Sequence, residues 1–134
     1  MIKSEIAIRV RYGETDRMGY VYYGNYATYF EVARVELLRT LGVNYRTMED
    51  DGISLPVLEY KIKYIKPAFY DELLDIKIVI NELPGVRIKF EYETYNSEKV
   101  LLNVAETTLV FVNTKNMKPC QPPDFLLEKM KPFF

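Results

Sequence analysis

The sequence of 134 residues contains no histidine, no tryptophan and one cysteine, Cys120. Without histidine there can be no Ser-His-Asp or Cys-His catalysis, and the usual neutral-pH base is missing. A single cysteine forms no intramolecular disulfide, and metal sites built on histidine or clustered cysteine are excluded as well. Any proton transfer must therefore use Asp, Glu, Tyr, Lys or water.

The sequence also lacks a charge excess and a long apolar run. The net charge of −1 argues against a non-specific nucleic-acid binder, because such proteins carry a strong basic excess. No apolar run approaches membrane-spanning length, and residues 1–12 alternate polar and apolar instead of building a signal-peptide core. We expect one domain over residues 1–134, cytoplasmic, with no membrane span and no nucleic-acid partner.

The apolar periodicity predicts one long helix near the N-terminus. Residues 5–11 alternate like a strand, and residues 25–41 carry apolar side chains at the three- and four-residue spacing of a helix face. Asn25 is the predicted N-cap of this helix, and Gly42 follows its end. A short helix is expected over residues 45–51, capped by Asn44 and stopped by Gly52.

The rest of the chain has the pattern of strands. Period-2 alternation predicts strands over residues 55–66, 74–81, 86–93 and 99–112, with turns at 83–85 and 96–97 and a last helix over 125–131. A single antiparallel sheet must bury one face, and the early helix is the only large apolar element available to cover it. The prediction is an α+β fold in which an antiparallel sheet wraps around a long central helix.

Asp16 lies in a Gly-punctuated loop a few residues before the predicted helix. A carboxylate can attack or deprotonate, and the N–H groups at a helix start can polarise a carbonyl, so the pair is a candidate acyl-transfer site. The alternative is that Asp16 only forms a turn beside Gly19.

Two segments resemble a known family. DRMGYVYYGNY from Asp16 to Tyr26, and YIKPAFYDEL from Tyr64 to Leu73, resemble hot-dog-fold thioesterases of the 4-hydroxybenzoyl-CoA thioesterase type. Chain length and element order are similar too. The resemblance implies the hot-dog fold and hydrolysis of acyl-CoA thioesters without a metal or cofactor.

The resemblance also implies catalytic roles. The family's catalytic aspartate, a nucleophile or general base, corresponds to Asp16. The helix-start residue whose backbone N–H polarises the thioester carbonyl corresponds to Tyr23, with Gly24 beside it. Many relatives have histidine at the position of Tyr23, but a backbone donor does not depend on the side chain. In another branch of the family, a tyrosine four residues before the aspartate is a proposed participant in catalysis, and Tyr12 corresponds to it.

Five further residues are candidates for substrate binding. Asn25 and Glu31 lie at the start and on the surface of the predicted helix, where capping and surface roles are the alternatives. Tyr64 is a candidate for an acyl pocket. Arg87 and Lys89 correspond to a basic cluster that contacts the nucleotide, although a solvated strand face or a charged edge is the favoured alternative for any single one.

The resemblance further implies a homo-oligomer, either a dimer or a homotetramer, with the active site between subunits. One sheet and one helix leave a strand edge and apolar surface uncovered, which agrees with that expectation. Three other functions remain open: an acyl-carrier-protein thioesterase, a hydrolase of aromatic acyl-CoA from quinone synthesis, and a non-catalytic acyl-binding or scaffold module. A dehydratase fits worse, because its usual Asp/His pair is missing.

Overall fold

The computed structural model describes all residues 1–134. In chain order the elements are β1 Ile2–Arg9, α1 Asn25–Thr40, α2 Tyr45–Asp50, β2 Ile53–Ser54, β3 Val57–Tyr64, β4 Leu73–Ile80, β5 Arg87–Tyr95, β6 Leu101–Val110, β7 Val112–Asn113, β8 Lys118–Pro119 and α3 Asp124–Met130. The predicted long helix, the short second helix, the strands and the last helix are all present.

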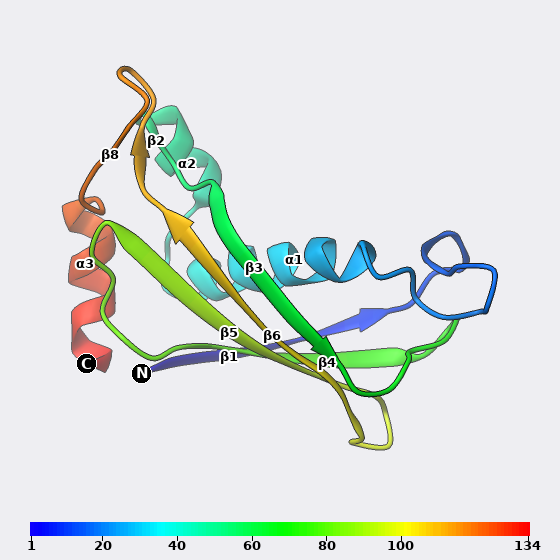
Figure 1. Cartoon of the computed structure of the whole chain (residues 1–134). Coiled ribbons are helices and arrows are strands. Elements are labelled where there is room, and N and C mark those ends of the chain that lie inside the picture. Colours follow the sequence, from blue (N-terminus) through cyan, green and yellow to red (C-terminus); the bar gives the residue numbers. More distant parts are fainter.

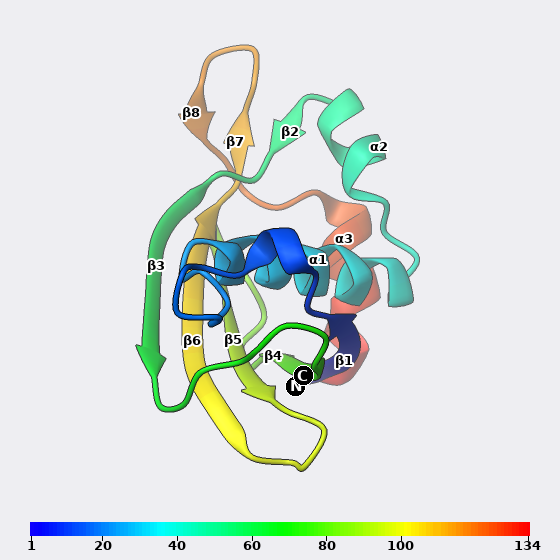
Figure 2. The ribbon, with the colours of Figure 1, turned by 90° about the vertical axis from the view of Figure 1, so that its right-hand side faces the viewer.

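The main sheet has the order β1-β4-β5-β6-β3 and is antiparallel throughout. It curls around α1, so that β3 and β1 form its two edges (Figures 1 and 2). The predicted α+β hot-dog architecture is therefore confirmed. The short strands β2, β7 and β8 form a second small sheet beyond the end of α1.

Alternation along the central strands explains why α1 is enclosed. Leu74, Ile76, Ile78 and Ile80 are buried on β4, and Ile88, Phe90 and Tyr92 are buried on β5. On the helix, Phe30 stacks on Tyr92 with ring centroids 4.4 Å apart. Each such apolar side chain contributes about 1.5–3 kcal/mol by leaving water, so the helix and the sheet stabilise each other.

The ends of α1 agree with the prediction in part. Gly42 has a φ of +77°, and Val43 N–H donates to the Leu38 carbonyl, so a C′ glycine closes the helix. The predicted N-cap is wrong: Gly24 occupies that position, and Asn25 is the first helical residue. The Asn25 side chain makes no cap, because its amide is used to bind the preceding loop.

The strand boundaries also differ from the prediction. β1 begins at Ile2 because it pairs with β4 along its whole length, from Ile2 opposite Ile80 to Arg9 opposite Leu73. The predicted strand over 99–112 breaks at Phe111, whose N–H donates to the Val86 carbonyl. Beyond that point the chain leaves the main sheet and pairs with β2 as β7.

The register separates the sheet into two ends. At the end where β1 runs into the loop of residues 10–24, Asp75 lies opposite Tyr95, and Tyr64 lies opposite Asn103. We call this the loop end. At the far end, Arg87 lies opposite Val110. No helix combines the length and apolar character needed to cross a membrane.

Candidate active site

The loop of residues 10–24 is held by backbone hydrogen bonds. Asp16 N–H donates to the Tyr20 carbonyl at 2.7 Å, and Val21 N–H donates to the Ala68 carbonyl at 2.9 Å. Gly19, at φ +83°, makes the tight turn between them, in a region that favours glycine. The loop is therefore anchored to the segment that precedes β4.

The Asp16 carboxylate is partly committed to this turn. Its Oδ1 atom accepts hydrogen bonds from Met18 N–H at 2.8 Å and Tyr20 N–H at 3.2 Å. Its other oxygen, Oδ2, makes no hydrogen bond, and the side chain is half-buried. The turn-forming interpretation of Asp16 is thus correct for one oxygen, while the second oxygen is left for chemistry.

Glu14 connects the loop to α1. Its carboxylate accepts from the Tyr29 hydroxyl at 2.9 Å, and from the Arg11 N–H and guanidinium at 2.8 and 3.1 Å. Its backbone carbonyl accepts from Tyr22 N–H at 2.8 Å and the Asn25 side-chain amide at 2.7 Å. Burial raises the pKa of Glu14, but the hydrogen bonds from Arg11 and Tyr29 outweigh it and hold that pKa below its ordinary value.

The start of α1 presents unused donors. Neither the Tyr23 N–H nor the Gly24 N–H has a hydrogen-bond acceptor within the protein. The next two N–H groups, from Asn25 and Tyr26, donate to the Tyr22 and Tyr23 carbonyls at 2.9 and 3.3 Å. Free N–H groups at a helix start favour negative charge nearby, as an oxyanion would supply.

A pocket of about 410 Å³ opens beside Asp16. Its lining comes from the loop, the first turn of α1 and the chain after β3: Asp16, Tyr20, Val21, Tyr23, Tyr26, Tyr64, Ile65, Lys66 and Pro67. We call it the site pocket. Four of these side chains are tyrosines, and burial raises the pKa of Tyr26 to about 12, so its hydroxyl stays protonated at neutral pH.

The site pocket unites three of the predicted site residues, Asp16, Tyr23 and Tyr64. Tyr12 is 78% exposed and packs its ring against Tyr70, with centroids 5.7 Å apart, outside the pocket lining. Glu31 is exposed on α1 and does not line the pocket either.

Arg87 and Lys89 lie at the far end of the sheet within this chain, because β5 begins there. Lys89 Nζ is 3.0 Å from a Glu106 carboxylate oxygen and 3.8 Å from one of Glu91. One chain therefore does not bring these two predicted nucleotide contacts together with Asp16.

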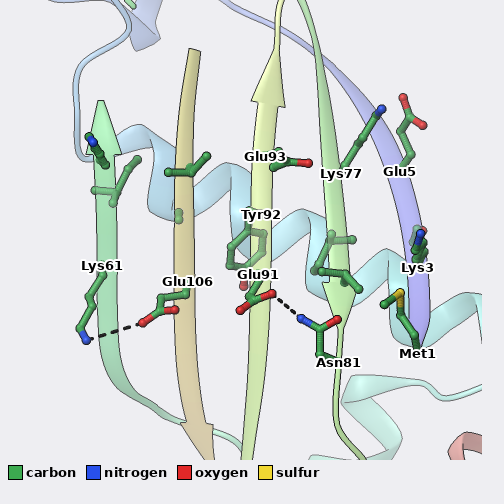
Figure 3. Close-up of a pocket in the computed structure, with 17 residues that line it drawn as sticks. Met1, Lys3, Glu5, Lys61, Lys77, Asn81, Glu91, Tyr92, Glu93 and Glu106 are labelled. Carbon is green, nitrogen blue, oxygen red and sulfur yellow. Dashed lines mark hydrogen bonds and ion pairs between the residues drawn. The ribbon is translucent and has the colours of Figure 1, made fainter. Parts of the chain in front are cut away.

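A larger groove, of about 1080 Å³, lies on the sheet face opposite α1 (Figure 3). Two contacts join side chains of its lining: Lys61 pairs with Glu106 at 3.6 Å, and the Asn81 amide donates to Glu91. Asp16 is not part of its lining. The larger hollow therefore carries side chains of both charges and does not include the candidate catalytic carboxylate.

Sequence reasoning missed Lys66 and Glu14 as site residues, whereas it included Tyr26 among the tyrosines that could line an acyl pocket. Lys66 places a cation in the pocket lining, and its position within the YIKPAFYDEL segment was an available signal. Nothing in the pattern around Glu14 indicated its bond to Tyr29. No group of three or more Cys, Asp or Glu side chains is arranged to hold a metal ion, and the absence of a cofactor stays a prediction.

Comparison with known proteins identifies the family. Residues 10–130 match the model of the thioesterase-like superfamily. The acyl-CoA thioester hydrolase YbgC of Escherichia coli is 32% identical over 124 residues, covering 92% of each chain. The acyl-CoA thioesterase YbgC of Haemophilus influenzae is 33% identical over 117 residues, covering 87% of this chain and 85% of the relative.

Solved structures agree with this result. A crystal structure described as DHNA-CoA thioesterase from Staphylococcus aureus superimposes with a TM-score of 0.87 at 38% identity, covering 90% of this chain and 81% of that one. The chain therefore belongs to the thioesterase-like superfamily. It is an enzyme, a thioesterase with the hot-dog fold.

Proposed function

We propose that the protein hydrolyses acyl-CoA thioesters to a free acid and CoA, with Asp16 as the nucleophile or general base. The observation that carries the proposal is the half-used Asp16 carboxylate, with Oδ1 held by two N–H groups and Oδ2 unbonded at a pocket. In the first role Oδ2 attacks the thioester carbon, the C–S bond breaks and CoA leaves as a thiolate that takes a proton from water; a second water then cleaves the acyl-aspartyl anhydride to the free acid and restores Asp16. In the second role Oδ2 takes a proton from the water that attacks the thioester carbon, the C–S bond breaks, and the departing CoA thiolate receives that proton.

The N–H groups of Tyr23 and Gly24 act as the oxyanion hole in this proposal. As the thioester carbon becomes tetrahedral, its oxygen gains negative charge that two free donors at a helix start stabilise. The support is that both N–H groups lack an acceptor and that Tyr23 lines the same pocket as Asp16. The tyrosine side chain at position 23 is not needed for this step.

The proposal includes a second copy of the chain. Strand β3 is an edge strand, and seven of its eight residues are exposed. If a two-fold axis pairs two β3 edges antiparallel along their full length, Val57 of the partner subunit lies beside Tyr64. That arrangement brings the far end of the partner's sheet, which carries Arg87 and Lys89 of the partner subunit, close to the loop end of the first subunit, where Asp16 lies. The nucleotide contact is then made across the interface, in a dimer or a tetramer.

A thiol-release assay over short, long and aromatic acyl-CoAs tests the activity, with two substitutions at Asp16. Asp16→Asn keeps an oxygen that accepts from Met18 and Tyr20, so the loop is retained, and turnover should fall by about 10²–10⁴-fold. Asp16→Ala should lose turnover and also about 1 kcal/mol of stability for each hydrogen bond. Wild-type turnover by Asp16→Asn would contradict the mechanism.

The same assay separates the alternatives. Activity on any acyl-CoA excludes a non-catalytic module. Faster release from an acyl carrier protein thioester than from the matching acyl-CoA would identify the carrier protein as the substrate.

A further inference from the structure

Two polar side chains are buried on the helix-facing side of the sheet without hydrogen-bond partners. The Asn103 side chain on β6 is fully buried, and both its amide oxygen and its amide nitrogen are unbonded. The Thr94 hydroxyl, directly opposite on β5, is fully buried and unbonded as well. Such groups are rare in native proteins, since each costs about 1–3 kcal/mol when it is left without a partner.

These groups lie directly behind the wall of the site pocket. Asn103 is paired on its other side with Tyr64, and Tyr64 packs against Tyr26 with ring centroids 5.8 Å apart. Both tyrosines line the pocket. The Tyr26 hydroxyl is close enough to the Asn103 amide for that amide to oppose the rise that burial causes in the Tyr26 pKa, although the two do not form a hydrogen bond of normal geometry.

The two tyrosines that separate the pocket from the pair differ in burial. Tyr26 is buried in the first turn of α1, whereas Tyr64 is 49% exposed at the end of an edge strand. If the half-exposed Tyr64 ring turns away from Tyr26 toward solvent, the pocket extends toward Asn103, its neighbour in the sheet. The site pocket would then have an aromatic wall and a floor that offers one donor, one acceptor and one hydroxyl.

We propose that Asn103 and Thr94 are specificity residues, forming a polar floor that binds a hydroxyl or carbonyl group at the distal end of the acyl group. The inference rests on the proposed function, because it assigns the acyl portion of that substrate. A site with buried polar groups rejects the analogue that lacks the matching group, since the floor is then left unpaired. An acyl group with a polar end is therefore preferred to its apolar counterpart.

The test compares benzoyl-CoA with its ring-hydroxylated counterpart 4-hydroxybenzoyl-CoA. The wild type should show a higher kcat/KM for the hydroxylated ester, and Asn103→Leu with Thr94→Val should reduce that preference by about tenfold or more. Thr107→Val is the matched control. Thr107 is also a buried threonine facing the helix, but its hydroxyl is bonded to Tyr92 at 2.6 Å.

Urea unfolding of the ligand-free proteins distinguishes a structural role of these residues from a role in substrate specificity. Thr107→Val breaks a hydrogen bond and should destabilise without altering the preference. Asn103→Leu and Thr94→Val remove unbonded groups and should leave the free energy of unfolding unchanged or higher. If these two variants lose as much stability as Thr107→Val, the pair is already bonded in the free protein and the proposal fails.

Failure of the floor is distinguishable from failure of the proposed function. Hydrolysis of both esters without a preference, or a preference that survives both substitutions, overturns the floor and leaves the hydrolase in place. If no acyl-CoA is cleaved, the hydrolase proposal fails. Calorimetric titration with benzoate and 4-hydroxybenzoate then tests the floor separately. Tighter binding of 4-hydroxybenzoate by the wild type, but not by the double variant, supports the floor, and any other result overturns it.

Discussion

The Tyr29 hydroxyl on α1 donates a 2.9 Å hydrogen bond to the carboxylate of Glu14 in the preceding loop. The same carboxylate is bonded to Arg11, and the Glu14 carbonyl accepts from Asn25 at the helix start. The position of the loop that carries Asp16 is therefore coupled to an ionised side chain that is mostly buried.

The Glu14–Tyr29 bond should make stability depend on pH. Because the folded pKa of Glu14 is lowered, the stability it contributes is fully present above pH 4.5 and is lost as the pH falls through the folded pKa. Tyr29→Phe removes one cause of the lowered pKa. The variant should lose about 1.5–3 kcal/mol at neutral pH and less in acid, measured by urea unfolding followed by circular dichroism.

Tyr45→Phe is the control for that measurement. The Tyr45 hydroxyl donates at 2.9 Å to the Leu55 carbonyl, which does not titrate, so its loss should cost the same free energy at both pH values. A Tyr29→Phe cost that is equally independent of pH would show that Glu14 is not ionised in the bond.

Gly24→Pro should remove one oxyanion donor. The Gly24 φ of −64° already suits proline, so the substitution deletes the N–H with little change in backbone shape at that residue. We expect kcat to fall by about 10²–10³-fold in the thiol-release assay. Gly24→Ala is the matched control for crowding, because its Cβ meets the same Tyr22 ring atom at 3.0 Å while the N–H is kept. Equal losses in the two variants would mean that crowding, not the donor, matters.

Arg87→Ala and Lys89→Ala should weaken binding of the nucleotide. If these cations meet phosphates, KM should rise for acyl-CoA and stay unchanged for a short thioester that lacks the nucleotide, and added salt should shrink the difference. Lys77→Ala is the control for loss of positive charge, because Lys77 lines the larger groove on the sheet face opposite α1. A KM that rises equally for both thioesters would reject the phosphate contact.

Leu58→Glu should dissociate the oligomer that we propose. Leu58 is an apolar side chain that is 52% exposed on the β3 edge, and a buried carboxylate at a pairing edge is costly. Sedimentation should show a multimer of the 15.8 kDa chain for the wild type and a smaller, less active species for the variant. Leu83→Glu is the control, because Leu83 is 39% exposed in the β4–β5 connection. A wild-type monomer with full activity would contradict the shared site.

Local patterns predicted most of the fold. The spacing over residues 25–41 specified α1, and the positive φ of Gly42 and Gly52 agrees with the helix ends read from the sequence. The strands were predicted by alternation, with errors at their ends, because pairing with a neighbour and not propensity decides where a strand stops. The N-cap was misplaced because Asn25 uses its side chain on a contact eleven residues away.

Some features of the core and of the site could be identified only from the tertiary structure. Arg34 is buried on α1 and donates to the Tyr92 hydroxyl at 3.1 Å, a burial that its charge does not suggest. Asn103 and Thr94 are polar residues on the buried face, so alternation of apolar residues does not reveal them. Arg87 and Lys89 matched by position in the sequence, but the register puts them at the far end of the chain's own sheet.

The sequence by itself determined the absence of histidine chemistry, the helix and strand types, and the closeness of Asp16 to the start of α1, because these depend on composition and on neighbours along the chain. Only the tertiary structure decided that Lys66 lines the pocket of Asp16, and that an unbonded Asn103–Thr94 pair lies behind it. The physical reason is that periodicity reports which face of a strand is buried, whereas the order and register of the strands decide what that face meets.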